Sequence, residues 1–137
     1  MKKKILSRKL KALTLIELLV VLAIIGILVL MALPNLMPMI TKAKSAEAQS
    51  NLSHIYTLQQ SYRYQYSKYN TNLTEIGFEA NKLSTEGGNA NYRYEVVEAS
   101  NSNFKARATA VVDFDGDGVM NVWEMDQDKA LKEVTPD

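Results

Sequence analysis

The residues that decide the fold are LLVVLAIIGILVLMAL, Leu18–Leu33, an almost wholly aliphatic run in a chain of 137 residues. No charged residue occurs from Leu18 to Thr41. As a helix, the run and its flanks are long enough to cross a hydrocarbon layer of ~30 Å. A cleaved secretory signal has a shorter apolar core followed by small residues, which LMA at 30–32 does not supply. The run therefore predicts a membrane-spanning helix.

Basic residues are concentrated directly ahead of this run. Lys and Arg beside an apolar span stay on the cytoplasmic side, so the rest of the chain is expected to face outward. Without this basic cluster, ten basic residues face fifteen acidic ones, and the charge from Leu13 onward is about −5. Such a balance argues against nucleic acid as a partner. The cluster holds six of the sixteen basic residues, namely Lys2, Lys3, Lys4, Arg8, Lys9 and Lys11.

A single carboxylate, Glu17, stands at the start of the apolar stretch, after Leu15 and Ile16. An unpaired charge near a hydrocarbon layer costs several kcal/mol by rough estimate, so such a residue usually marks a partner or a function. The alternative is that Glu17 lies at the membrane surface and is solvated there.

The stretch KALTLIELLVVLAIIGILVLMALP at 11–34, with TLIEL at 14–18, resembles the N-terminus of type IV prepilins and of type II secretion pseudopilins. In that family a prepilin peptidase removes a short basic leader on the cytoplasmic side, and the new N-terminal residue is methylated. The resemblance implies cleavage between Ala12 and Leu13 and N-methylation of Leu13. The family usually has Gly before the cut and Phe after it, and here both positions are likewise small and apolar.

Cleavage would create an α-ammonium at Leu13, four residues before Glu17 and on the same face of a helix. By resemblance, Glu17 pairs with the N-terminal amine of a neighbouring subunit during assembly. Gly26, Pro34 and Pro38 are expected to interrupt and bend the helix, because each proline deletes one backbone hydrogen bond. The resemblance further implies that the segment from Gly26 to Pro34 loosens on assembly, while a plain kinked anchor is the alternative.

Beyond Pro38 a helical rhythm continues to about Tyr66, which gives one helix of on the order of 80 Å from Leu13. Its second half is amphipathic, and its tyrosines are expected in core or interface packing. The predicted apolar stripe comprises Ala43, Ala46, Leu52, Ile55, Tyr56, Tyr62 and Tyr66. The tyrosines in question are Tyr56, Tyr62, Tyr64, Tyr66 and Tyr69.

The second half of the chain alternates like strands at 91–99 and 103–112, with further strands expected at about 119–125 and 130–134. These predict a small antiparallel sheet lying on the helix, an α+β fold. The predicted organisation is a leader at 1–12, an apolar helix half at 13–40, an amphipathic half at 41–67 and a β-sheet head at 68–137.

The segment DFDGDGVMNVWE, Asp113–Glu124, fits the spacing of a calcium-binding loop. Three carboxylates on a tight turn repel one another, and a hard cation would relieve this repulsion. The alternative is an Asp-Gly hairpin turn with solvated charges, because the flanking segments alternate like strands and not like helices. The predicted ligands are Asp113, Asp115 and Asp117 by side chain, Val119 by its carbonyl oxygen, Asn121 directly or through water, and Glu124 bidentately.

An enzyme is not expected, since the chain has no cysteine, a single histidine (His54) and no phosphate-cradling glycine motif. The sequence instead predicts a structural subunit of a type IV pilus-like filament, a homo-oligomer built by an assembly machinery. It would reside in the inner membrane of a Gram-negative-type bacterium and then in a pilus on the cell surface or in the periplasm. One alternative is a type II secretion pseudopilin. Another is an uncleaved single-pass protein with a calcium-binding external domain.

Overall fold

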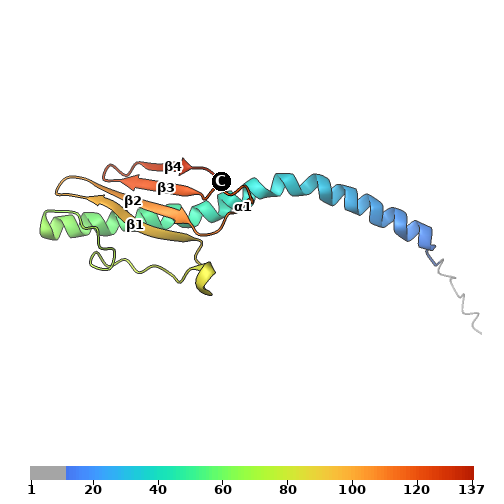
Figure 1. Cartoon of the computed structure of the whole chain (residues 1–137), viewed down its shortest axis with the longest axis horizontal. Helices are drawn as coiled ribbons and strands as arrows, with labels where there is room; N and C mark the ends of the chain where they lie inside the picture. The colour runs from blue at the N-terminus through green and yellow to red at the C-terminus, as the bar shows by residue number, and fades with distance from the viewer. Residues whose placement is uncertain (1–11) are drawn as a thin grey trace, which may run out of the picture. The chain divides into compact units, whose positions relative to one another are not determined.

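A computed structural model describes residues 12–137, so most of the predicted leader lies outside the described residues. The described part contains one long helix, α1, a short 3₁₀ turn and a four-stranded sheet (Figure 1). The bounds are α1 Leu15–Tyr66, η1 Ser84–Glu86, β1 Tyr92–Ala99, β2 Phe104–Ala110, β3 Val122–Asp126 and β4 Leu131–Thr135. The predicted α+β class is confirmed.

Helix α1 is a single element of 52 residues, which confirms the long helix. It continues through Gly26, Pro34 and Pro38, so the helix is not interrupted there, while the expected bend at these residues stays a prediction. Each proline removes only one backbone donor, and the strongly helical aliphatic neighbours carry the remaining hydrogen bonds across that position.

The apolar half of α1 is fully exposed: Leu30 is 70% and Met31 68% accessible, and no residue of its most apolar window is buried. By length and composition this helix is able to cross a membrane. The chain divides into two compact units, the first ending at Leu36 and the second comprising Met37–Asp137, called the head below.

Within the head, the strands form an antiparallel meander in the order β1-β2-β3-β4. β1 and β2 begin within a residue of their predicted starts, and the expected fourth strand is present as β4. β3 begins at Val122 and not at about Val119, because Val119 to Asn121 still belong to the acidic loop.

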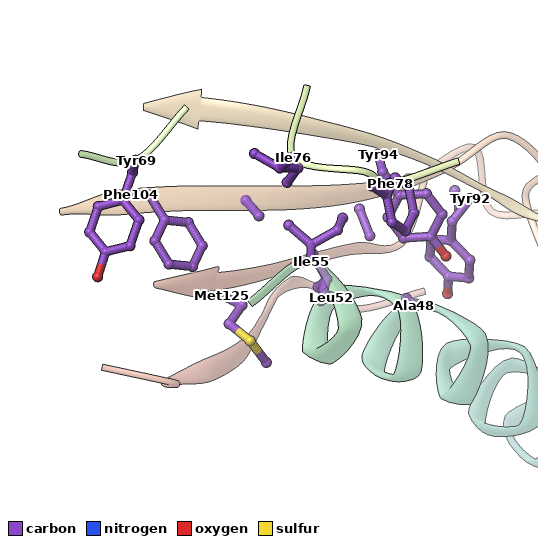
Figure 2. Packing of buried hydrophobic residues seen from close by; sticks show 13 residues of the cluster. Ala48, Leu52, Ile55, Tyr69, Ile76, Phe78, Tyr92, Tyr94, Phe104 and Met125 are labelled. Atoms are coloured by element: carbon purple, nitrogen blue, oxygen red, sulfur yellow. The ribbon is translucent and has the colours of Figure 1, made fainter. Parts of the chain in front are cut away.

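The core lies between the sheet and the second half of α1 (Figure 2). Alternate residues of β1 and β2 are buried, including Tyr92, Tyr94 and Phe104, as the strand alternation predicted. The alanines of β2 leave room for the larger side chains of the helix, of which Leu52 and Ile55 are completely buried. Burying a side chain of this size contributes about 1.5–3 kcal/mol.

The buried stripe of α1 differs in part from the predicted one. Leu52 and Ile55 belong to it as expected, but Ala43, Ala46 and Tyr66 are exposed. The buried face of α1 instead includes small and polar side chains. Its residues are spaced three and four positions apart, which places them on one side of the helix. The buried residues of α1 are Thr41, Ser45, Ala48, Leu52, Ile55 and Gln59.

Gln59 fixes the chain where it leaves the helix. Its side chain is fully buried, its Nε2 donates to the Asn70 carbonyl at 2.5 Å, and its Oε1 accepts from the Asn70 amide at 3.0 Å. One amide side chain thus satisfies both backbone groups of one loop residue. The loop that follows brings Ile76 and Phe78 onto the core beside Tyr94 (Figure 2).

We expect Gln59→Leu to lower the free energy of unfolding by about 1–3 kcal/mol, because two partly buried backbone groups of Asn70 lose their partners. Urea unfolding of the full chain in detergent, followed by circular dichroism, measures this. Gln60→Leu is the matched control, since Gln60 makes only a 3.4 Å hydrogen bond to the Tyr69 hydroxyl. Equal losses of unfolding free energy in the two variants would contradict the stabilising role of the Gln59–Asn70 hydrogen bonds.

Candidate assembly and metal sites

The predicted cleavage site lies just ahead of the helix. Ala12, Leu13 and Thr14 are outside any helix or strand and exposed, and the Leu13 side chain is 76% accessible. A peptide bond in an extended, exposed segment is accessible to a peptidase, whereas one inside a helix is not. The basic cluster before it lies outside the described residues.

Glu17 closes a reciprocal cap on the first turn of α1. Its Oε2 accepts from the Thr14 amide at 2.7 Å and from the Thr14 hydroxyl at 2.9 Å, and the Thr14 hydroxyl oxygen accepts from the Glu17 amide at 3.3 Å. This is a capping box, in which Thr14 is the cap residue. Within residues 12–137 the other carboxylate oxygen, Oε1, makes no hydrogen bond. The cap therefore aims the carboxylate and leaves one oxygen for a further donor.

The acidic loop wraps its backbone around Asp113. The two Asp113 carboxylate oxygens accept from the amides of Gly118 at 2.7 Å and Gly116 at 2.6 Å. Both glycines have a positive φ, 88° and 84°, which lets their amides turn inward. The Gly118 amide, followed by that of Gly116, lowers the pKa of Asp113 below its ordinary value of 3.8.

A fourth carboxylate, that of Asp137, joins the loop from the segment after β4. Asp113, Asp115, Asp117 and Asp137 each place one carboxylate oxygen within 4.8 Å of the others. Asp137 Oδ2 accepts from the Phe114 amide at 3.0 Å, whereas Oδ1 is buried and has no hydrogen-bond partner among the described residues. A buried carboxylate oxygen without a donor is costly unless a cation neutralises it. Four converging carboxylates fit a hard divalent cation.

The structure corrects the predicted ligand Glu124. Its side chain lies on the face of the sheet that carries Arg107, whose guanidinium donates to Glu124 Oε1 at 2.7 and 2.8 Å. Strand pairing places Glu95, Arg107, Glu124 and Lys132 in one row of alternating charge across the four strands. Glu124 therefore serves cross-strand pairing, because β3 directs it toward its neighbours and not back into the loop.

Asn121 is also not free to act as a ligand, because it is fully buried at the junction of helix and sheet. Its Oδ1 accepts from the Tyr92 hydroxyl at 2.7 Å and from the Ser45 hydroxyl at 3.4 Å. Its Nδ2 donates to Glu133 at 2.8 Å and to the Thr135 carbonyl at 3.1 Å. Both ends of the amide are thus occupied. Val119, the remaining predicted ligand, is exposed, and its amide donates to Asp117 at 2.7 Å.

Sequence reasoning missed Asp137, which is far from the loop in the chain and outside its spacing motif. No local signal identified it. The antiparallel return of β4 along β3 brings Asp137 back to the loop that precedes β3.

An apolar helix half long enough to cross a membrane, a capped carboxylate at its start and a small antiparallel sheet on its second half define an α+β architecture of the type IV pilin kind. Residues 34–119 match the family model described as "Type IV minor pilin ComP, DNA uptake sequence receptor", and residues 7–33 match the prokaryotic N-terminal methylation motif. The chain belongs to the type IV pilin family, a family of structural proteins.

The chain is also similar to the type IV major pilin protein PilA of Myxococcus xanthus (strain DK1622), with 40% identity over 90 residues. This alignment covers 66% of the chain but only 38% of the PilA relative. The matched family model describes a minor pilin, whereas PilA is a major pilin.

The buried Tyr92 hydroxyl predicts loss of stability in alkali. Burial raises the pKa of Tyr92 to about 12 and also raises the pKa of Tyr94. The folded state thus holds these protons above pH 10, where the unfolded chain releases them. Stability is therefore complete below about pH 10 and falls toward pH 12, by up to about 1.4 kcal/mol per pH unit for each tyrosine.

We expect Tyr92→Phe to reduce the dependence of the unfolding free energy on pH above pH 10 by the equivalent of about one proton. At neutral pH the variant should lose about 1 kcal/mol of stability, because the hydrogen bond to Asn121 is missing. Urea unfolding of the full chain at a series of pH values measures both effects. Tyr64→Phe, at an exposed ring, is the control and should leave the slope unchanged. An unaltered slope in Tyr92→Phe would refute the role of the Tyr92 hydroxyl in the alkaline loss of stability.

Proposed function

We propose that this pilin is a structural subunit that is cut between Ala12 and Leu13, methylated at Leu13 and polymerised through the apolar half of α1. No catalytic step of its own is involved. The observation that carries the proposal is an apolar helix half that is fully exposed and that begins with the capped carboxylate of Glu17. Its partners would be a prepilin peptidase, a pilus assembly machinery and further copies of the chain.

The exposed surface of the first half of α1 is apolar. Its aliphatic side chains are stable only in lipid or against other apolar helices, so the subunit belongs in the inner membrane as a precursor and within a filament after assembly. Glu17 is the one charged residue on the described part of this half. Its Oε1 would accept from the α-ammonium of Leu13 in a neighbouring subunit, which would set the register between helices. Loosening between Gly26 and Pro34 on assembly is part of the same proposal.

Glu17→Ala is expected to abolish filaments while leaving cleavage intact, because it removes the only acceptor for the neighbour's ammonium but leaves Ala12 and Leu13 unchanged. Electron microscopy counts filaments on cells that express the variant with a prepilin peptidase and an assembly motor, and mass spectrometry reads the N-terminus. The control is Glu98→Ala, an exposed carboxylate on β1.

Normal filaments from Glu17→Ala would overturn the register role. An N-terminus at Met1 in the unaltered protein would favour the uncleaved membrane-anchored alternative. A processed subunit that forms only short periplasmic assemblies, in a cell with a type II secretion system, would favour the pseudopilin alternative.

We also propose that the acidic loop binds calcium through Asp113, Asp115, Asp117 and Asp137. The support is the convergence of the four carboxylates and the buried, unpartnered Oδ1 of Asp137. A bound ion would tie the segment after β4 to the loop before β3, and so would supply a staple that a chain without cysteine otherwise lacks.

Calorimetric titration of the full chain in detergent with millimolar calcium should show binding and a raised melting temperature. Asp137→Asn is expected to weaken binding about tenfold, because it removes a charged ligand. Glu124→Gln is the discriminating control and should bind calcium unchanged, since Arg107 holds that side chain. Absence of heat, or loss of binding in Glu124→Gln, would reject this ligand set.

The DNA uptake sequence receptor function belongs to the description of the matched family model. In this chain the charge of about −5 from Leu13 onward gives a DNA role no support, and the absence of a nucleic-acid partner stays a prediction.

A further inference from the structure

The end of α1 carries the most exposed large aromatic side chains of the head. Tyr64 is 89% and Tyr66 58% accessible, so of the two expected roles, core or interface packing, core packing is excluded for both. Tyr56, Tyr62 and Tyr69 pack on or within the core. The last turn of α1, the green end of the helix in Figure 1, contains Tyr64. It lies on the order of 40 Å along the helix from Met37, at which the head begins.

Beside Tyr64 is a depression of about 360 Å³, lined by Gln60, Arg63, Tyr64 and Ser67. The Arg63 guanidinium is fixed in place, since it lies 5.1 Å from the centre of the Tyr69 ring and donates to the Tyr69 hydroxyl at 3.1 Å. An aromatic ring, an amide, a hydroxyl and an oriented cation therefore meet in one concave surface.

Ser67 follows α1 at the edge of the depression and has a left-handed backbone conformation. It follows the last helical residue with φ 57°, and its amide donates to the Arg63 carbonyl at 2.8 Å. Glycine is the usual residue at this left-handed position, because a side chain there is strained. A serine is therefore strained at this position, which borders the depression.

The charge of the depression is positive. Among the described residues, the ion pairs all involve Arg107, so neither Arg63 nor the neighbouring Lys68 has a carboxylate partner. No acidic side chain lines the depression. It therefore fits an anionic ligand that also offers a flat apolar face to Tyr64.

We propose that this depression binds an acidic polysaccharide, with a sugar ring stacked on Tyr64 and a uronate carboxylate held by Arg63. Sugar rings have an apolar C–H face surrounded by hydroxyl groups, which matches an exposed tyrosine flanked by Gln60 and Ser67. Arg is the side chain best suited to a carboxylate, because its guanidinium forms two parallel hydrogen bonds. Nucleic acid carries a much denser charge, which the acidic head repels.

The proposal does not depend on filament formation, so it is tested with the full chain in detergent micelles. Microscale thermophoresis measures the affinity for a labelled short oligogalacturonate, a neutral dextran oligomer and an oligothymidylate of matched length. We expect binding of the oligogalacturonate only. Tyr64→Ala should weaken it about tenfold, since a stacked aromatic ring is lost. Arg63→Gln should also weaken it about tenfold, since the carboxylate loses its charged donor.

Ser67→Gly separates ligand binding from folding, because it should weaken binding while keeping or raising the melting temperature. Arg93→Gln, an exposed cation on β1, is the matched control and should bind unchanged. Tighter binding of the oligothymidylate would overturn the proposal in favour of a nucleic-acid surface. Absence of oligogalacturonate binding, or unchanged binding in Tyr64→Ala, would also overturn it. If Tyr64→Ala altered only self-association, the surface would be a subunit contact instead.

Discussion

The constraint on which this protein depends is the exposure of the apolar half of α1, which water does not tolerate. Leu30 and Met31 are more than half accessible, and every residue of the most apolar window is uncovered. Lipid or another apolar surface must cover it, and both surroundings penalise a charge. Glu17 satisfies that condition in part through its own cap, because Thr14 supplies two donors to one carboxylate oxygen and leaves the other available.

The head solves a different problem, that of holding a small sheet on one helix without a disulfide. The buried face of β2 carries small alanine side chains. They allow Leu52 and Ile55 of α1 to pack closely against the sheet. Polar side chains complete the junction: Asn121 connects α1, β1 and the segment of β4, and Gln59 secures the loop after the helix. Since buried polar groups are costly when unpaired, these contacts specify one arrangement of helix and sheet.

The two surfaces proposed for ligands lie at different parts of the head and differ in charge. Three carboxylates of the acidic loop and that of Asp137 converge next to the junction with α1, where Lys44 lies over the Phe114 ring at 4.6 Å. The depression at Tyr64 combines a cation with an exposed aromatic ring at the end of the helix. A chain that is acidic from Leu13 onward therefore still offers a localised positive surface, because charge acts over short distances in salt solution.

The sequence by itself determined the long helix that is apolar enough to cross a membrane, the position of Glu17, the strand alternation and the α+β class, because each depends on residues a few positions apart. It also identified three of the four converging aspartates, since Asp113, Asp115 and Asp117 share one turn. Only the tertiary structure decided that Glu124 pairs with Arg107, that Asn121 is buried and that Asp137 joins the loop. Those positions follow from the register between strands distant in the chain, and a register shift of one residue moves a side chain to the opposite face of the sheet.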